Sequence, residues 1–187
     1  MADWTAYYDA AGDEPRETLV QALEAFAAPG FAVDLGCGTG RDTLELVRRG
    51  WRVLAIDGSA EGIARLEARE LPRVETRVVS FAQAAWPTCD LVNSSFALPF
   101  CAPDDFDALW ARIVASLRAG GRFAGQLFGD RDGWHGDPAM TFQTRAQVER
   151  LSRSFDPERF DEEEFDGKTA LGAPKHWHLF QLVLRKR

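Results

Sequence analysis

The sequence predicts a doubly wound α/β domain, in which helices cover both faces of a mostly parallel sheet. Short apolar segments alternate with amphipathic segments from residue 31 to residue 128, an order typical of consecutive βαβ units. A glycine-rich corner joins the first apolar segment to the first amphipathic segment. The chain has 187 residues, enough for one large core, so we expect a single domain over residues 1–187.

The N-terminal region, residues 1–28, is expected to hold an arm and a helix. Residues 1–14 show little regular pattern, and their aromatic side chains suit either an arm held by packing or a flap over a ligand. Pro15 is acceptable in the first turn of a helix, and an apolar stripe at helical spacing follows it. Arg16 lies near the start of this helix, where we expect a solvated side chain.

The alternating pattern of residues 31–128 gives each element in turn. We expect strands at 31–35, 51–56, 74–79, 89–93 and 122–128, and helices at 41–49, 60–70 and about 103–118. Gly120 and Gly121 are expected to end the last of these helices, as glycine commonly does.

The remainder of the chain departs from this alternation. Residues 129–143 form a polar loop, longer than most loops that have no function. Thr144 and Gln147 have the spacing of a capping box, which predicts a helix at 145–153. We therefore expect residues 144–187 to comprise this helix and an antiparallel hairpin of segments 158–165 and 176–185, with the acidic run 161–164 on a solvated edge strand.

Composition disfavours several functional classes. No apolar run approaches the roughly 20 residues of a membrane span, and the first residues do not resemble a secretion signal. Cys37, Cys89 and Cys101 show no C-x-x-C spacing, so we expect neither disulfides nor a metal site. The net charge of −7 disfavours nucleic-acid binding. A cytoplasmic protein acting on a small molecule is the expectation.

The corner that runs from Val33 to Gly40 predicts a nucleotide site. Its glycines permit positive φ and close contact between a ligand and the main chain, beside the positive end of a helix dipole. A dinucleotide fingerprint, G-x-G-x-x-G, would need glycine where Arg41 or Thr43 stands. The sequence is instead D-x-G-x-G-x-G, and Asp57 ends the next strand at a distance suited to ribose hydroxyls.

These residues, Val33-Asp34-Leu35-Gly36-Cys37-Gly38-Thr39-Gly40, resemble motif I of the class I S-adenosylmethionine-dependent methyltransferases. Within that family the chain is most similar to the small tellurite-resistance-type members. The resemblance extends to residues 76–79 and to the final strand, and so covers nearly the whole chain. It implies a Rossmann-like seven-stranded sheet of order 3-2-1-4-5-7-6 with an antiparallel C-terminal strand. Residues 31–128 would then form the cofactor-binding core, and residues 129–143 an acceptor-side loop.

The resemblance also implies S-adenosyl-L-methionine as the cofactor and S-adenosyl-L-homocysteine as its product. Asp34 and the glycine loop would meet the methionyl part, Asp57 the ribose, and Ser80 with Phe81 the adenine. Asn93 would touch the amino acid moiety or the acceptor, and Arg16 is an alternative contact for the cofactor carboxylate. The expected cofactor-binding residues are Asp34, Gly36, Cys37, Gly38, Gly40, Asp57, Gly58, Ser59, Ser80, Phe81 and Asn93.

The reaction expected from the resemblance is an in-line methyl displacement onto a small acceptor. A thiol or chalcogen anion would need no base, whereas an oxygen or protonated nitrogen acceptor would need one. His135 and Asp130 are the catalytic candidates, with Asp132, His176 and His178 as further possibilities for the base. We expect parts of residues 4–8, 93–101 and 130–140 to wall the acceptor pocket, with Tyr8, Phe96 and Trp134 among them.

Two alternatives remain beside a small-molecule methyltransferase. One is a non-catalytic S-adenosylmethionine-binding protein that acts through interaction or regulation, because an intact glycine loop argues for binding in both cases. The other is a nicotinamide oxidoreductase, which the glycine spacing disfavours.

Overall fold

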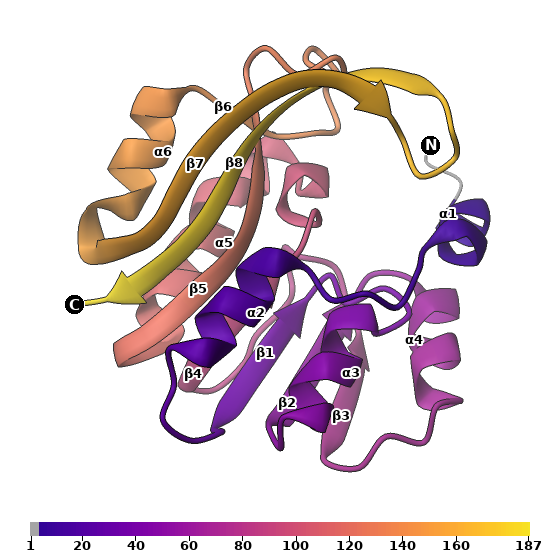
Figure 1. Ribbon diagram of the computed structural model, residues 1–187, viewed down its shortest axis with the longest axis vertical. Coiled ribbons are helices and arrows are strands. Elements are labelled where there is room, and N and C mark those ends of the chain that lie inside the picture. Colours follow the sequence, from indigo (N-terminus) through magenta and orange to yellow (C-terminus); the bar gives the residue numbers. More distant parts are fainter. Residues whose placement is uncertain (1–3) are drawn as a thin grey trace.

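The fold is seen in a computed structural model that describes residues 4–187. Its sheet has the order β3-β2-β1-β4-β5-β8-β7, with the short β6 paired to β5 outside this path (Figure 1). Only β8 runs against its neighbours β5 and β7. The expected fold class and strand order are confirmed, and β6 is an additional strand. The strands are β1 (Phe31–Leu35), β2 (Arg52–Asp57), β3 (Val74–Val78), β4 (Cys89–Ser94), β5 (Leu117–Gly129), β6 (Phe142–Gln143), β7 (Phe155–Lys168) and β8 (Pro174–Lys186).

Helices cover both faces of the sheet because alternate strand residues bury apolar side chains on opposite sides. Ala32 of β1 packs in a core cluster with side chains of α2, α3 and α4, whereas its neighbour Val33 packs with α5 and α6. The helices are α1 (Trp4–Ala10), α2 (Glu17–Glu24), α3 (Arg41–Arg48), α4 (Ala60–Glu67), α5 (Pro103–Ser116) and α6 (Arg145–Leu151), with 3-10 turns η1 (Leu98–Phe100) and η2 (Ser152–Ser154).

The N-terminal segment is more regular than its sequence pattern indicates. Residues 4–10 form a helix, and three polar contacts at four-residue intervals run from this segment to α4 and the turn after it. These contacts join Thr5 to Glu61, Asp9 to Arg65, and Asp13 to Arg69, at 2.6–2.7 Å. We call this set the N-terminal ladder. Its interacting side chains are dispersed along the sequence, which explains why the helix is not apparent from an apolar stripe.

Gly120 and Gly121 do not end α5, which stops at Ser116. They lie within β5, between the pairings of Leu117 with Cys89 and of Arg122 with Leu91, where the register with β4 shifts. Gly120 has a φ of +78°, a conformation that suits a bulge as well as a helix end. The glycine pair therefore marks an irregularity of the strand.

The C-terminal region contains the predicted helix and hairpin. Thr144 and Gln147 form the capping box, because each side chain accepts a hydrogen bond from the other residue's backbone amide. β7 and β8 are longer than expected and curve together as one ribbon (Figure 1). β7 is the edge strand, as expected for the acidic run 161–164. Its acidic side chains are not simply solvated, however, because they form ion pairs with arginines; Glu162, for example, pairs with Arg131 and Arg145. Within residues 4–187, no helix combines the length and the apolar character that crossing a membrane requires.

Candidate functional site

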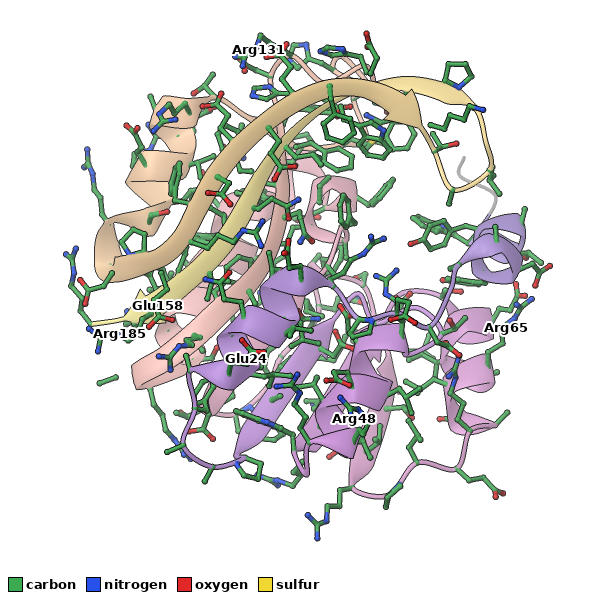
Figure 2. The ribbon with its side chains drawn as sticks, in the orientation of Figure 1. Glu24, Arg48, Arg65, Arg131, Glu158 and Arg185 are labelled. Atoms are coloured by element: carbon green, nitrogen blue, oxygen red, sulfur yellow. The ribbon has the colours of Figure 1, made fainter. Side chains whose placement is uncertain are left out.

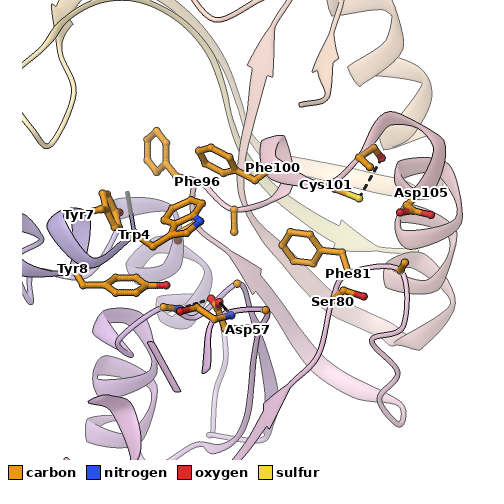
Figure 3. Close-up of a pocket in the computed structure, with 18 residues that line it drawn as sticks. Trp4, Tyr7, Tyr8, Asp57, Ser80, Phe81, Phe96, Phe100, Cys101 and Asp105 are labelled. Atoms are coloured by element: carbon orange, nitrogen blue, oxygen red, sulfur yellow. Dashed lines mark hydrogen bonds between the residues drawn. The ribbon is translucent and has the colours of Figure 1, made fainter. Parts of the chain in front are cut away.

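A cavity of about 520 Å³ lies where the parallel strands end. Its walls begin directly after β1, at the end of β2, and shortly after β3 and β4, which is the edge where ligands bind in open α/β sheets. Side chains from α1 and from the start of α5 complete it (Figure 3). The lining residues are Trp4, Tyr7, Tyr8, Gly36, Gly38, Asp57, Gly58, Ser59, Ser80, Phe81, Ala82, Ser95, Phe96, Ala97, Phe100, Cys101, Ala102 and Asp105.

The glycine loop exposes main chain to this cavity. Gly36 and Gly38 both line it, with φ angles of +77° and +54°, which residues other than glycine rarely adopt. A Cβ on Gly36 would collide with Ala97, and one on Gly38 would lie 3.3 Å from the ring of Tyr8. Glycine is therefore required for the conformation of the loop and for the close packing above it.

Asp57 connects the glycine loop to the start of α4. One carboxylate oxygen accepts a hydrogen bond from the Gly38 amide at 2.8 Å, and the other accepts one from the Ser59 amide at 2.7 Å. A carboxylate oxygen has two acceptor positions, so each oxygen retains capacity for a ligand hydroxyl. Asp57, Gly58 and Ser59 all line the cavity, so the structure brings these three predicted residues together.

Ser80, Phe81, Cys101 and Asp105 occupy one side of the cavity (Figure 3). Ser80 and Phe81 were predicted, whereas Asp105 was not. Burial raises the pKa of Cys101 to about 11, so this side chain is a neutral thiol and not a nucleophile at neutral pH.

Aromatic rings form another side of the cavity. Trp4 and Phe100 meet edge to face, with ring centroids 4.9 Å apart. Tyr8 packs over Gly38, and burial raises the pKa of its hydroxyl. The Arg16 guanidinium lies 4.5 Å from the centroid of the Phe96 ring. Arg16 is thus half buried rather than solvated, and its Nε has no hydrogen-bond partner among residues 4–187.

Asp34 and Asn93 lie beneath the glycine loop and do not line the cavity. Asp34 accepts hydrogen bonds from Thr43 at 2.6 Å and from Asn93 at 2.9 Å, and Asn93 also donates to Asp42. Burial, reinforced by the neighbouring charge of Asp42, raises the pKa of Asp34 to about 7. Cys37 and Gly40 of the loop are likewise outside the lining.

The candidate bases lie away from the cavity. His135 packs against Phe142, with ring centroids 5.3 Å apart, and neither Asp130 nor Trp134 lines the cavity. Trp134 stands one ring behind its wall, with its centroid 6.3 Å from that of Phe100. No residue of the segment 130–140 reaches the cavity lining.

The other predicted bases are held in hydrogen bonds outside the cavity. Asp132 forms a buried ion pair with Lys175. His178 accepts a hydrogen bond from the Arg131 amide through Nδ1, and its Nε2 lies 3.0 Å from Glu162 and 3.1 Å from the Arg131 guanidinium. His176 binds Asp166 and Glu164 at the surface.

Ser95, Ala97 and Phe100 line the cavity within the predicted segment 93–101, although none of them was singled out, and Asp105 lies outside every segment predicted to wall the acceptor pocket. The spacing of Phe96 and Phe100, four residues apart directly after the fourth strand, was the available signal. The predicted acceptor residues Tyr8 and Phe96 do line the cavity, together with Trp4 and Tyr7 from the same N-terminal helix.

The sequence is similar to methyltransferases and to related S-adenosylmethionine-dependent proteins. Residues 32–121 match a methyltransferase domain family. The carboxy-S-adenosyl-L-methionine synthase of Shewanella amazonensis is 35% identical over 114 residues, which are 56% of this chain and 47% of that protein. The trans-aconitate 2-methyltransferase of Deinococcus radiodurans is 35% identical over 102 residues, which are 54% of this chain and 38% of that protein. The chain thus spans less than half the length of these two relatives.

Solved structures share the fold over most of the chain. TehB from Haemophilus influenzae superimposes with a TM-score of 0.80 and 18% identity, over 92% of this chain and 62% of that chain. The Burkholderia thailandensis 1,6-didemethyltoxoflavin-N1-methyltransferase, with 1,6-didemethyltoxoflavin and S-adenosylhomocysteine bound, has a TM-score of 0.69 and 25% identity, over 98% and 79% of the two chains.

Proposed function

We propose that the chain is a class I S-adenosylmethionine-dependent methyltransferase, which transfers a methyl group from S-adenosyl-L-methionine to a small-molecule acceptor. The observation that carries the proposal is the exposed main chain at Gly36 and Gly38 joined to the carboxylate of Asp57 within one cavity. The bound S-adenosylhomocysteine of the Burkholderia thailandensis relative supports the choice of donor.

The adenosine part of the donor is assigned to the side of the cavity between Asp57 and Ser80. The free acceptor positions on Asp57 suit the two ribose hydroxyls. Ser80 and Phe81 are assigned to the adenine, and the nearby carboxylate of Asp105 suits its exocyclic amino group.

The methionyl part is assigned to the glycine loop and the start of α2. The carboxyl groups of Asp34 and Asp42, which both bind Asn93, lie beneath the loop and outside the cavity lining, so they would favour the methionyl ammonium only through the field they exert across the loop. The methionyl carboxylate suits Arg16, whose buried Nε lacks a partner among the described residues.

The acceptor is assigned to the space beside Tyr8 and Phe96. The family chemistry is displacement at the donor's methyl carbon, and positioning of the two reactants can supply much of the rate enhancement. The predicted bases His135 and Asp130 do not line the cavity, which supports an acceptor that needs no deprotonation, such as a thiolate or another chalcogen anion.

Calorimetric titration of the purified protein with S-adenosylmethionine, S-adenosylhomocysteine and NAD tests the donor assignment. We expect the two sulfur nucleosides to bind and NAD not to bind. Asp57→Ala should weaken S-adenosylhomocysteine binding at least tenfold, since it removes the ribose partner, whereas Glu24→Ala at an exposed position of α2 should not. Equal affinity of the wild type and Asp57→Ala would contradict the assignment.

Methyl transfer is tested separately, with a panel of thiols, selenite, tellurite, phenols and amines. Product from any of them supports an enzyme. Binding of the donor without product from any acceptor would favour a non-catalytic, interaction-based role.

A further inference from the structure

The acceptor side of the cavity is formed by four aromatic residues, Trp4, Tyr7, Phe96 and Phe100, which we call the aromatic wall. They come from two separate parts of the chain, α1 and the segment between β4 and α5. Figure 3 shows their rings on one side of the cavity, with Ser80 and Asp105 on the other. Aromatic rings bind flat, apolar groups by stacked and edge-to-face contacts, so the wall is suited to a planar ring.

The wall holds its shape through contacts that do not involve a ligand. Trp4 and Phe100 meet edge to face across the junction of the two segments. Phe96 is fixed on its far side by the Arg16 guanidinium and by a hydrogen bond from its amide to Gln126 at 3.0 Å. A planar ligand would therefore meet preformed aromatic surfaces, which lowers the entropic cost of binding it.

Among the residues that the structure describes, none of the four side chains of the wall is a carboxylate, a histidine or a lysine. The remaining acceptor positions of Asp57 are assigned to the ribose of the donor, and Asp105 lies on the opposite side of the cavity. Cys101 is a neutral thiol, as described above. Burial raises the pKa of Tyr8, so its hydroxyl keeps its proton at neutral pH, and the described lining contains neither histidine nor lysine.

From these two features, and on the premise of the methyl transfer proposed above, we infer that the acceptor is an aromatic or heteroaromatic thiol that binds as its thiolate. The wall selects the planar ring, and the lack of a base selects a nucleophile that is already ionised at neutral pH. Aromatic thiols ionise near neutrality, whereas simple phenols and aliphatic thiols remain largely protonated.

The reaction balances without a proton transfer. A lone pair of the thiolate sulfur forms the new bond to the methyl carbon, and the bond from that carbon to the sulfonium sulfur breaks. Its electron pair stays on the donor sulfur, which becomes neutral. The products are an aryl methyl thioether and S-adenosylhomocysteine, and no co-reactant is required.

Four acceptors separate the two features in an initial-rate assay at saturating S-adenosylmethionine, with reactions lacking protein as blanks. Thiophenol is planar and ionised, phenol is planar and protonated, cyclohexanethiol is non-planar and protonated, and selenite is an inorganic anion. We expect kcat/KM for thiophenol to exceed each of the others at least tenfold. A second aryl thiol of lower pKa should shift the rise of the pH–rate profile to lower pH by the difference between the two thiol pKa values.

Variants test the wall itself. Phe100→Leu and Trp4→Leu should each raise KM for thiophenol about tenfold and leave the dissociation constant of S-adenosylhomocysteine within twofold. Phe165→Leu, at an exposed aromatic position on β7, is the matched control and should change neither quantity. A loss of donor binding in Phe100→Leu would indicate general damage to the site, and Trp4→Leu then decides.

Equal or faster turnover of phenol, cyclohexanethiol or selenite would overturn the inference while leaving methyl transfer intact. A pH–rate profile whose midpoint is the same for both aryl thiols would also overturn it, because it would reveal a base on the protein. Donor binding without any product contradicts the inference as well. A failure of the proposed function is recognised separately, as absence of S-adenosylhomocysteine binding or as donor binding without product from any acceptor of the wider panel, whereas product from another acceptor but not from thiophenol overturns this inference alone.

Discussion

Lys175→Met tests the buried ion pair that fastens the loop 129–143 to β8. The Lys175 and Asp132 side chains are 1% and 0% exposed. Asp132 also accepts hydrogen bonds from the amides of Trp134 at 3.0 Å and His178 at 3.3 Å. The ammonium lies 4.3 Å and 4.0 Å from the ring centroids of Trp134 and Trp177, so both rings make cation–π contacts with the charge.

The expected cost follows from the charge that stays behind. Methionine fills a similar volume, but it leaves the Asp132 carboxylate buried without a cation, which costs about 3–5 kcal/mol. The lost cation–π contacts are worth about 0.5–2 kcal/mol, and sulfur–aromatic contacts of the methionine, about 0.3–1.5 kcal/mol, offset much of that. We therefore expect a decrease of about 4 kcal/mol in the free energy of unfolding, dominated by the unpaired carboxylate.

Urea denaturation at pH 7.5 measures this change. The double variant Asp132→Asn/Lys175→Met should recover at least half of the loss, because it removes the buried charge while the asparagine oxygen can still accept a hydrogen bond from one of the two amides. Lys168→Met, at an exposed position on β7, is the matched control and should stay within about 0.5 kcal/mol of the wild type. A loss below about 1 kcal/mol in Lys175→Met, or no recovery in the double variant, would show that water reaches Asp132 and refute the reasoning.

Three further predictions concern the glycine loop and two carboxyl groups. Gly38→Ala should weaken S-adenosylhomocysteine binding at least tenfold and lower stability by about 1–2 kcal/mol, because a side chain at φ +54° is strained and meets Tyr8; calorimetry and urea denaturation of the variant check both. The pKa of Asp34 is raised to about 7 from an ordinary value near 3.8, so between these pH values the folded state binds more protons than the unfolded state and this group makes stability fall as pH rises. Asp34→Asn should remove this dependence of stability on pH. Denaturation curves of the wild type that do not change between pH 4.5 and 7.5 would contradict the prediction. The pKa of Glu162 is lowered to about 2 by hydrogen bonds from His178, Arg145 and Arg131, so its stabilisation is present above pH 4.5 and lost as pH falls toward 2; Glu162→Gln should lose stability at pH 7 and show a shallower acid transition by circular dichroism, whereas an unaltered transition would count against the assignment.

The sheet was predictable because its signals are local. The strands at residues 31–35, 52–57 and 89–94 are short, mostly apolar runs. The glycine-rich corner after the first of them indicates a turn from a strand into a helix beside a ligand. The segments that differed depend on partners distant in sequence. α1 is held by side chains of α4 and the turn after it, about 56 residues away, and Gly120 takes its role from the register of β5 with β4. An apolar or glycine pattern alone does not contain that information.

The candidate site divides in the same way. Asp57 ends a strand and lines the cavity, as its position in the sequence indicates. Asp34 lies in the adjacent strand β1, but its side chain binds Thr43 of α3 and is buried beneath the loop. Whether a strand-end carboxylate faces the cavity or is buried depends on which helix packs over it, and the sequence does not show this. Asp132 and His178 looked like free bases, and their partners across the loop and hairpin could not be read from the sequence. Phe100 belongs to a 3-10 turn, whose side chains follow neither helical nor strand periodicity.

The N-terminal ladder holds a helix that covers both the donor position and the acceptor position of the cavity. Figure 2 shows Arg65 at the surface of α4, beneath α1, and its partners Asp9 and Glu61 are also solvent-exposed. Exposed ion pairs contribute about 0–1 kcal/mol each, and dissolved salt screens them further. The same short helix places Tyr8 over Gly38 and Trp4 against Phe100. Detachment of this helix would therefore uncover both the donor and the acceptor positions at once, and the exchange of both ligands should quicken together as ionic strength rises.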